Sequence, residues 1–340
     1  MRVVYFVAVR PGQKCGVADY THQLAQAVTQ QGIDARVEEL PAWSIPALRR
    51  LTKTYGGEEA TIFHLQYPSL GMGKSCAPAL LPMVFPRRRV FITFHEFEQF
   101  NPVRKLYFLF SSFLNGNFIF TNEHERHIVS RFLPWRANTS HIIPIGNNIA
   151  VFPVGNEMGR MHRRRLIYFG QIAPDKGIEE FLQTVEHLRR QNDDIPCSII
   201  GALLDPNSEI ARKVRDVSNA YQIDCLFNLP SEDVSKELQK ASIALLPFPE
   251  GVSDKRGSAL VCLKHGLAVI TRHSDLTPSW WRETTHGVEN YQSAARAVED
   301  ILAGRKQKVP QPSTLTDALS EREWSNIARS HLAMYERQAG

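Results

Sequence analysis

Residues 166–190 read LIYFGQIAPDKGIEEFLQTVEHLRR and contain one complete structural unit. The short apolar run at 166–169 predicts a buried strand, and the stretch 170–177, which contains glycine and proline, predicts a loop. From 177 to 190 the apolar residues recur every three or four positions, which is typical of a helix with one buried face. Because a strand followed by a loop and a helix is the building block of a parallel sheet, this stretch predicts an α/β fold.

The same alternation recurs in both halves of the chain. Further apolar runs that predict strands lie at 3–9, 61–65, 90–93, 118–121, 141–143, 198–200, 224–227, 243–246 and 268–271, and helical periodicity lies at 17–30, 102–114, 123–132, 209–221 and 234–239. At about 150 residues per domain, 340 residues correspond to roughly two domains. We therefore expect two doubly wound α/β domains, at 1–152 and 153–318, followed by a C-terminal helix at 319–340. In such domains ligands bind beyond the carboxyl ends of the strands.

The composition limits the classes of protein to which this chain can belong. With 43% hydrophobic and 22% charged residues, it is typical of a globular protein. No apolar run approaches 18 residues, so no membrane-spanning helix is expected, and the apolar run at 3–9 is too short for a signal peptide. The five cysteines contain no C-x-x-C pair. This argues against a disulfide framework or a zinc site and favours the cytoplasm.

Positive charge is concentrated in the first half of the chain. Residues 1–155 contain 16 Lys and Arg against 10 Asp and Glu, whereas residues 156–340 contain 24 against 25. A basic half can face phosphates, an anionic membrane or an acidic substrate, although solvated arginines give the same balance. The arginine cluster at 87–89 and the apolar segment 104–120 predict peripheral contact with the inner face of the plasma membrane. A helix that covers its own sheet is the alternative.

Two loops of the first half are candidate binding segments. The stretch RPGQKCG at 10–16 follows the first strand and opens a helix at Gly16, where a helix N-terminus can hold an anion. It lacks the G-x-G-x-x-G pattern of dinucleotide sites, and a structural turn is the alternative. The stretch GMGKS at 71–75 lies in the context of a phosphate-binding P-loop, but Pro68 replaces the first glycine of that motif. The P-loop is therefore the weaker interpretation.

A histidine at the end of a predicted strand is a candidate catalytic residue. His95 follows the run at 90–93 and precedes Glu96, whose carboxylate can orient an imidazole. A structural histidine is the alternative. His64 ends the preceding run and is expected to line the same cleft. The histidines show no spacing typical of metal ligands, so no metal site is expected.

Two loops of the second half are candidate phosphate-binding segments, because each places cations at the start of a helix. The candidate residues are Gly170, Gln171 and Lys176 in the first loop, and Lys255, Arg256, Gly257 and Ser258 in the stretch PFPEGVSDKRGSA at 247–259. Helix-start amides with a nearby lysine or arginine suit phosphate groups, although a solvated lysine is the simpler alternative. Two such loops in one domain predict a ligand with more than one phosphate.

Five segments together resemble the retaining GT-B glycosyltransferases of family 4, namely CGVADYT, FHE, IPIGNNI, FGQIAPDKG and GVSDKRGSALVCLKHGLAVIT. They span nearly the whole chain, and the last looks most like a subgroup of bacterial surface-polysaccharide assembly. The resemblance implies two Rossmann-like domains facing a cleft, with the C-terminal helix crossing back to the first domain. It also implies sugar transfer from a nucleotide diphosphate sugar, with a UDP-sugar favoured, to a saccharide or lipid-linked saccharide, without a metal or cofactor.

The resemblance also implies roles for single residues. Lys176, Lys255 and Arg256 would stabilise the departing diphosphate, and His95 would contact the donor sugar, oriented by Glu96. The acceptor would bind to the first domain, against Gly16 and the loop at 71–75, and the nucleotide sugar would bind to the second domain.

Three positions depart from the family pattern. Gln171 stands where the pattern G-R-x-x-x-x-K-G has arginine, and Ser253 and Val261 stand where many members have two glutamates. The residue that recognises the nucleotide ribose therefore cannot be assigned from the resemblance. Lys255 or Arg256 is expected to supply the charge that Gln171 lacks. A non-catalytic GT-B-like partner protein is the alternative, and a P-loop nucleotide-hydrolysing enzyme is a weaker one.

Overall fold

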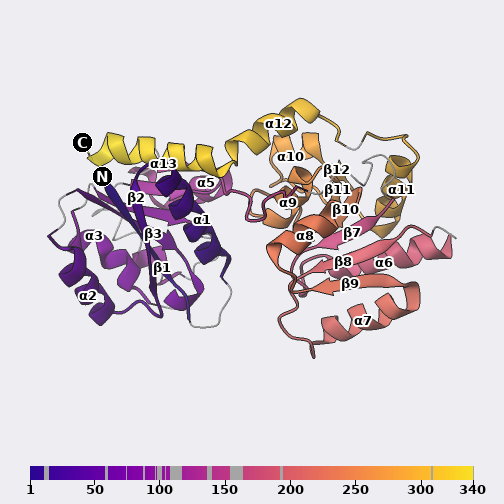
Figure 1. The fold of residues 1–340 in the computed structure, drawn as a ribbon, viewed down its shortest axis with the longest axis horizontal. Coiled ribbons are helices and arrows are strands. Elements are labelled where there is room, and N and C mark those ends of the chain that lie inside the picture. The colour runs from indigo at the N-terminus through magenta and orange to yellow at the C-terminus, as the bar shows by residue number, and fades with distance from the viewer. Residues whose placement is uncertain are drawn as a thin grey trace. The chain divides into compact units, whose positions relative to one another are not determined.

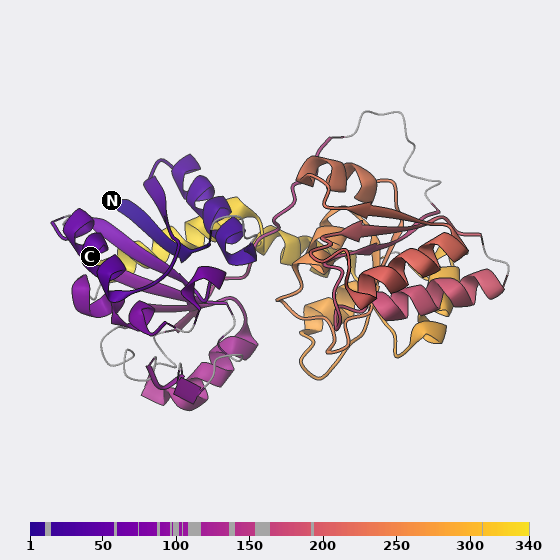
Figure 2. The same ribbon diagram turned by 90° about the horizontal axis from the view of Figure 1, so that it is seen from below.

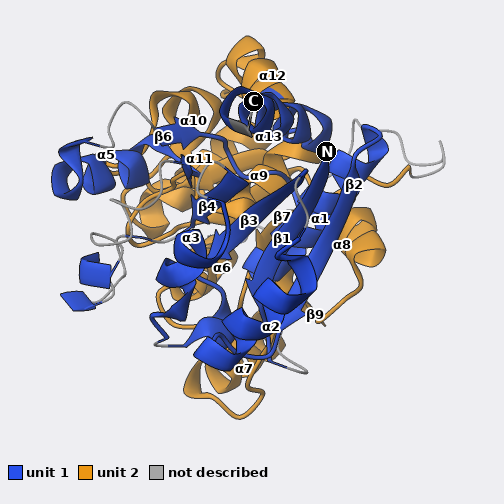
Figure 3. Cartoon of the chain, turned by 90° about the vertical axis from the view of Figure 1, so that its left-hand side faces the viewer, with its two compact units in different colours: residues 1–148, 321–340 blue, residues 149–320 orange. Residues whose placement is uncertain are grey.

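A computed structural model describes most of the chain. The described residues are 1–10, 15–57, 60–73, 75–86, 89–95, 97, 102–103, 105–107, 117–135, 140–153, 164–191, 194–307 and 309–339. The chain divides into two compact units, which Figure 3 draws in different colours. Unit 1 consists of residues 1–148 and 321–340, and unit 2 consists of residues 149–320. Each unit has a hydrophobic core of its own.

Unit 1 is built on a parallel six-stranded sheet with the strand order β2-β1-β3-β4-β5-β6 (Figure 1). Its strands are β1 (Arg2–Ala8), β2 (Asp34–Leu40), β3 (Thr61–Tyr67), β4 (Val90–Phe94), β5 (Asn117–Phe120) and β6 (Ser140–Ile142). β1, β3, β4 and β5 are buried almost throughout, as expected for strands covered on both faces. β2 lies at the edge, and its residues are exposed or partly buried except for the buried Leu40.

Helices cover both faces of this sheet. They include α1 (Gly16–Gln30), α2 (Ile45–Tyr55), α3 (Leu81–Val84), α5 (Glu123–Phe132) and α13 (Trp324–Ala339), with 3₁₀ turns at Leu70–Met72 and Ala77–Leu80. Apolar residues of α1 and α13 pack with Val3, Tyr5 and Phe91 on one face of the sheet. Residues of α2 and α3 pack with Phe6 and Phe63 on the other face.

The C-terminal helix α13 packs on unit 1 and runs beside α1, as the yellow ribbon shows in Figures 1 and 2. Nε1 of Trp324 donates a hydrogen bond of 2.7 Å to the carbonyl oxygen of Asn147. Nε2 of Gln31 donates one of 2.8 Å to the carbonyl oxygen of Ser325. The two units divide after residue 148 and again after residue 320.

Unit 2 repeats the architecture with a second parallel sheet, in the order β12-β11-β10-β7-β8-β9. Its strands are β7 (Leu166–Phe169), β8 (Cys197–Gly201), β9 (Ile223–Phe227), β10 (Ile243–Leu246), β11 (Ala268–Thr271) and β12 (His286–Gly287). Its helices include α6 (Ile178–Arg190), α7 (Glu209–Tyr221), α8 (Ser231–Leu238), α9 (Gly257–Lys264), α10 (Ser279–Thr284), α11 (Tyr291–Leu302) and α12 (Pro312–Glu321). One continuous hydrophobic core joins the sheet to these helices.

The two sheets confirm the predicted α/β fold with two doubly wound domains. β7 and α6 form where the stretch at 166–190 predicts a strand and a helix. Most of the helix predicted at 102–114 lies outside the described residues. Within the part of the chain that is described, no helix is both long and apolar enough to cross a membrane.

Candidate functional site

The topology of unit 2 brings two loops together at one edge of its sheet. From β7 the chain continues through β8 and β9 on one side, and β10, β11 and β12 then follow on the other side. β7 and β10 are therefore neighbours, and the loops that follow them, 170–177 and 247–256, leave the sheet side by side. In doubly wound sheets this change in strand order opens the crevice in which ligands bind.

The loop after β7 is held in shape by Tyr168 and Gly177. The Tyr168 hydroxyl lies 3.2 Å from the carbonyl oxygen of Gln171 and 3.0 Å from that of Lys176. Burial raises the pKa of Tyr168, so the hydroxyl remains a donor at neutral pH. Gly177 has a φ of +85°, and a Cβ there would lie 2.4 Å from the carbonyl oxygen of Pro247. This close approach joins the loop after β7 to the loop after β10.

The loop after β10 is anchored by polar contacts from its neighbours. Oδ1 of Asp254 accepts hydrogen bonds from Nε1 of Trp280 and of Trp281, at 3.0 and 3.1 Å. The carbonyl oxygen of Val252 accepts one of 2.8 Å from Oγ1 of Thr277. These contacts fix the backbone immediately before the two cations predicted to bind phosphate, and a fixed backbone limits how far those cations can move.

Arg256 carries a buried donor for which the described part of the chain offers no hydrogen-bond partner. Its guanidinium carbon lies 4.8 Å from the centre of the Phe248 ring, and one terminal nitrogen lies 3.2 Å from Oε2 of Glu250. Among the described residues, its buried Nε has no hydrogen-bond partner. An unpaired buried donor costs free energy, and a guanidinium binds phosphate and carboxylate oxygens well. The Arg256 side chain can therefore donate to an anionic ligand.

Helix α9 begins directly after Arg256 and adds one backbone donor, the N–H of Ser258, to the same place. No side chain within the described chain caps its first turn, and the N–H of Ser258 makes no hydrogen bond to a described residue. A Cβ on Gly257 would meet no atom within 4 Å, so the fold itself does not require glycine there. Open space beside a helix start and a guanidinium suits a phosphate group.

The other predicted residues of this half lie in the loop after β7. Gly170 directly follows the strand, Gln171 is exposed and Lys176 is half-buried. Lys255 is also half-buried, in the loop after β10. Unit 2 thus places all seven candidate residues in the two loops that meet at Gly177, or at the helix start that follows.

Two ion pairs of this site are not singled out by the sequence patterns. Glu250 follows β10, and its 85% exposed side chain pairs with Arg256. Arg272 follows β11 and pairs with Glu180 of α6 at 2.5 Å, while burial raises the pKa of that carboxyl. Both Glu250 and Arg272 lie just beyond the end of a strand. Ligands bind beyond the strand ends of such sheets, so a search of the residues that follow every predicted strand would select them.

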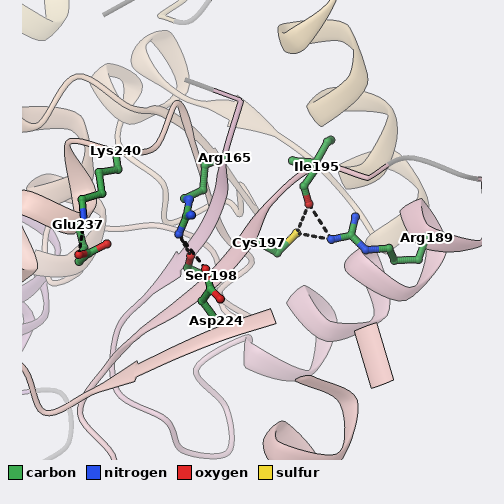
Figure 4. Close-up of polar contacts among 8 residues, drawn as sticks. All are labelled: Arg165, Arg189, Ile195, Cys197, Ser198, Asp224, Glu237 and Lys240. Atoms are coloured by element: carbon green, nitrogen blue, oxygen red, sulfur yellow. Dashed lines mark hydrogen bonds and ion pairs between the residues drawn. The ribbon is translucent and has the colours of Figure 1, made fainter. Parts of the chain in front are cut away.

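The opposite edge of the same sheet carries a polar cluster of a different kind (Figure 4). Arg165, directly before β7, donates a hydrogen bond of 2.7 Å to Oγ of Ser198 and forms an ion pair of 3.1 Å with Asp224. Arg189 donates 2.7 Å to the carbonyl oxygen of Ile195. These arginines join protein groups around the starts of the strands, so their contacts stabilise the sheet.

In unit 1, His95 directly follows β4 and is held on several sides. Its backbone N–H donates 2.9 Å to the carbonyl oxygen of Tyr67, and its Nε2 lies 2.9 Å from Oε1 of Gln66. The imidazole and the Tyr20 ring meet edge to face, with centres 5.0 Å apart. Burial lowers the pKa of His95 to about 3, so the imidazole is neutral at physiological pH. Glu96, the predicted orienting residue, lies outside the described residues.

The prediction that His64 lines a cleft is wrong, because β3 continues beyond it to Tyr67. His64 is fully buried in the middle of that strand. Its Nε2 lies 2.7 Å from Oγ1 of Thr93, and its Nδ1 lies 2.5 Å from the hydroxyl of Tyr335. The side chain therefore links the sheet to α13.

The two predicted binding loops of unit 1 are described only in part. Gly16 is the first residue of α1, and a Cβ there would meet no atom within 4 Å, but residues 11–14 lie outside the described residues. A Cβ on Gly71 would lie 2.7 Å from the carbonyl carbon of Ala8. Glycine at 71 is thus required for close packing on β1, and this packing explains it without a P-loop.

The comparisons with known proteins agree with this architecture. Residues 163–303, which lie in unit 2 and contain the loops described above, match the family described as "Glycosyl transferases group 1". None of the curated proteins matches the sequence.

Solved structures resemble the chain over nearly its whole length. A glycosyltransferase from Rickettsia africae aligns with a TM-score of 0.76 and 13% identity, over 99% of this chain and 98% of that one. HepE of Anabaena in complex with UDP aligns with a TM-score of 0.71 and 11% identity, over 99% of this chain and 100% of that one. Sucrose-phosphate synthase from Thermosynechococcus elongatus aligns with a TM-score of 0.66 and 15% identity, over 99% of each chain. The chain therefore has the GT-B fold, and the family match in unit 2 supports a glycosyltransferase.

Proposed function

We propose that the protein is a retaining glycosyltransferase that moves a sugar from a nucleotide diphosphate sugar, with a UDP-sugar favoured, to a saccharide or lipid-linked saccharide in bacterial polysaccharide biosynthesis. The observation that carries this proposal is the buried Nε of Arg256, which has no hydrogen-bond partner among the described residues and lies beside the start of α9, within the segment that matches the family. HepE, which shares the fold, was solved with UDP and with UDP-glucose.

In this proposal unit 2 holds the two phosphates. Departure of the nucleotide diphosphate develops negative charge on its oxygens, and cations already fixed in place stabilise that charge more than they stabilise the bound donor. Lys176, Lys255 and Arg256 supply the positive charge, and the Ser258 N–H supplies a backbone donor. His95 contacts the donor sugar as a neutral group that accepts or donates a hydrogen bond, since it does not ionise at physiological pH.

The reaction is proposed to need no metal ion and no cofactor. Among the described residues, no group of three or more His, Cys, Asp or Glu could hold a metal. Because Lys176, Lys255 and Arg256 are proposed to supply the positive charge that a metal ion would supply, we expect transfer from UDP-sugars to continue at an unchanged rate in excess EDTA. Release of UDP, measured over a panel of UDP-, GDP- and ADP-sugars with saccharide acceptors, tests this, and the anomeric proton of the product tests retention.

Two results of that assay would contradict the proposal. Activity lost in EDTA and restored by Mg²⁺ or Mn²⁺ would contradict metal independence. Binding of a nucleotide sugar without release of nucleotide or transfer of sugar would favour the non-catalytic partner protein, for which Gln171, Ser253 and Val261 are the arguments.

Unit 1 is proposed to bind the acceptor and to contact the cytoplasmic face of the membrane. Its exposed apolar residues include Val103, Leu106, Tyr107, Phe132 and Trp135. Nζ of Lys105 lies 5.3 Å from the centre of the Phe132 ring, so these two segments lie together. Apolar side chains near basic ones suit the surface of an anionic bilayer. Arg87, Arg88, Arg104 and residues 108–116 lie outside the described residues.

We expect the protein to co-sediment with anionic vesicles at low salt, and less at high salt, because the charges are screened. The double variant Leu106→Glu and Phe132→Glu should lose this binding. Leu204→Glu, which changes an equally exposed leucine of unit 2, is the matched control and should keep it. Equal binding by both variants, or no binding of the wild type to anionic vesicles at low salt, would contradict membrane contact through this surface.

A further inference from the structure

Polar side chains line the face of the unit 1 sheet that α1 and α13 cover. They are fully or almost fully buried and come from three strands and two helices: Tyr5, His64, Gln66, Thr93, Tyr20, His331 and Tyr335. The register pairs Gln66 of β3 with Thr93 of β4, so these two residues are neighbours, and His95 follows two residues later on the same face. The polar cluster therefore leads from the middle of the sheet to its carboxyl edge at His95.

One part of this cluster is joined by hydrogen bonds. The His64 imidazole bridges Thr93 and Tyr335, and the Tyr335 hydroxyl donates 3.3 Å to that of Tyr5. Nδ1 of His331 lies 2.9 Å from the carbonyl oxygen of Ile327, one helical turn earlier. The bonds of Tyr335 to His64 and Tyr5 fix α13 on the sheet, whereas the His331 contact lies within the helix.

The other part of the cluster contains unpaired atoms. Within the described chain, the Tyr20 hydroxyl, Nε2 of Gln66 and Nε2 of His331 are buried without a hydrogen-bond partner. Each such group costs free energy, and apolar side chains of similar shape would avoid that cost. Gln66, moreover, is a carboxamide in a strand whose seven residues are all buried. Among the described residues, its side chain has one hydrogen-bonded partner, the candidate catalytic histidine His95.

We propose that Gln66 is a positioning residue, which holds His95 in the tautomer with the proton on Nε2 and so presents Nδ1 as a hydrogen-bond acceptor for a hydroxyl of the donor sugar. The carboxamide oxygen of Gln66 only accepts, so the ring nitrogen that faces it must donate. In a neutral imidazole the other nitrogen then carries a lone pair. The Tyr20 ring meets the imidazole edge to face and limits its rotation, and the Tyr67 carbonyl holds the backbone of His95.

The tautomer can be read directly, without any assay of activity. Nitrogen-15 NMR of the full chain, with the His95 signals assigned from their loss in His95→Gln, distinguishes a protonated ring nitrogen from an unprotonated one. We expect Nε2 to be protonated and Nδ1 unprotonated in the wild type, and a mixture of both tautomers in Gln66→Leu. Thr93→Val is the matched control, because it removes the bond to His64 and leaves that to His95.

The kinetic part of the test rests on the proposed function. Gln66→Leu is expected to lower kcat for transfer by about 10- to 100-fold, because a poorly oriented contact near the reacting centre costs that much. The Kd for UDP should stay unchanged, since unit 2 holds the nucleotide in the proposal. Gln66→Glu, whose carboxylate also accepts, should restore most of kcat, and in a His95→Ala background Gln66→Leu should have no further effect.

The two readouts separate the two proposals. The expected tautomers without any sugar transfer would contradict the proposed function and support the positioning by Gln66. A wild-type His95 protonated on Nδ1, or an unchanged tautomer and kcat in Gln66→Leu, would overturn the positioning role. If Gln66→Leu does not fold, the wild-type spectrum and Gln66→Glu decide.

Discussion

Replacing Lys255 and Arg256 together by alanine is expected to lower kcat/KM for sugar transfer by at least about 10³-fold. The loss of a single preorganised donor costs about 10²- to 10³-fold in other enzymes, and here two neighbouring cations are removed. Steady-state release of UDP measures the effect. The melting temperature should remain close to that of the wild type, because both side chains are half-buried and lie outside the hydrophobic core.

Two controls show whether this loss is specific. The double variant Arg212→Ala and Arg215→Ala removes the same charge from exposed positions of α7 and should leave kcat/KM unchanged. Arg256→Lys keeps the charge and loses the planar arrangement of guanidinium donors. Its kcat/KM should therefore lie between that of the wild type and that of the double alanine variant. Wild-type rates in the Lys255 and Arg256 double variant would refute the phosphate assignment.

The free energy of unfolding of unit 1 is expected to fall steeply as the pH is lowered from about 6.5 toward 4. Burial lowers the pKa of His64, that of His95 to about 3 and that of His331 to about 4. Below about pH 6.5 the unfolded chain therefore binds protons that the folded unit does not bind. Each such proton contributes about 1.4 kcal/mol per pH unit, so three contribute about 4 kcal/mol per pH unit.

His331→Leu is expected to reduce this pH dependence by about one proton between pH 4 and 6.5, as measured by urea titration followed by hydrogen exchange in peptides of β3 and α13. Tyr335→Phe is the control. It removes the hydroxyl that contacts His64, but burial raises the pKa of Tyr335 well above its usual range, so no proton is exchanged in this interval. It should lower stability equally at every pH. A His331→Leu protein with the wild-type slope would contradict the prediction.

The fold could be predicted wherever a buried strand is a continuous apolar run. The run at 166–169 corresponds to β7, residue for residue. β2 was not predicted, because an edge strand with the sequence DARVEEL is only partly buried and carries four charged residues. The end of β3 was also misjudged, because Gln66 interrupts the apolar pattern although the strand continues to Tyr67.

The candidate site could be predicted only where its residues follow a strand in sequence. Lys176 and Arg256 are candidates on this ground, since strand ends and helix starts are visible as local patterns, and their role in binding stays a prediction. The contact of Gln66 with His95 was not found, because neighbouring strands and not neighbouring residues bring them together. The bond between His64 and Tyr335 joins residues 271 positions apart, and no local pattern reports such a pair.

Hydrogen–deuterium exchange of the full chain, with and without UDP, tests most directly whether the two loops after β7 and β10 bind the nucleotide of the sugar donor. The expected result is slower exchange with UDP in peptides that cover residues 170–177 and 250–260, and no change in peptides of α7. The Lys255→Ala and Arg256→Ala double variant should show no such protection. Protection confined to other segments, or none with UDP, GDP or ADP, would contradict the proposed site.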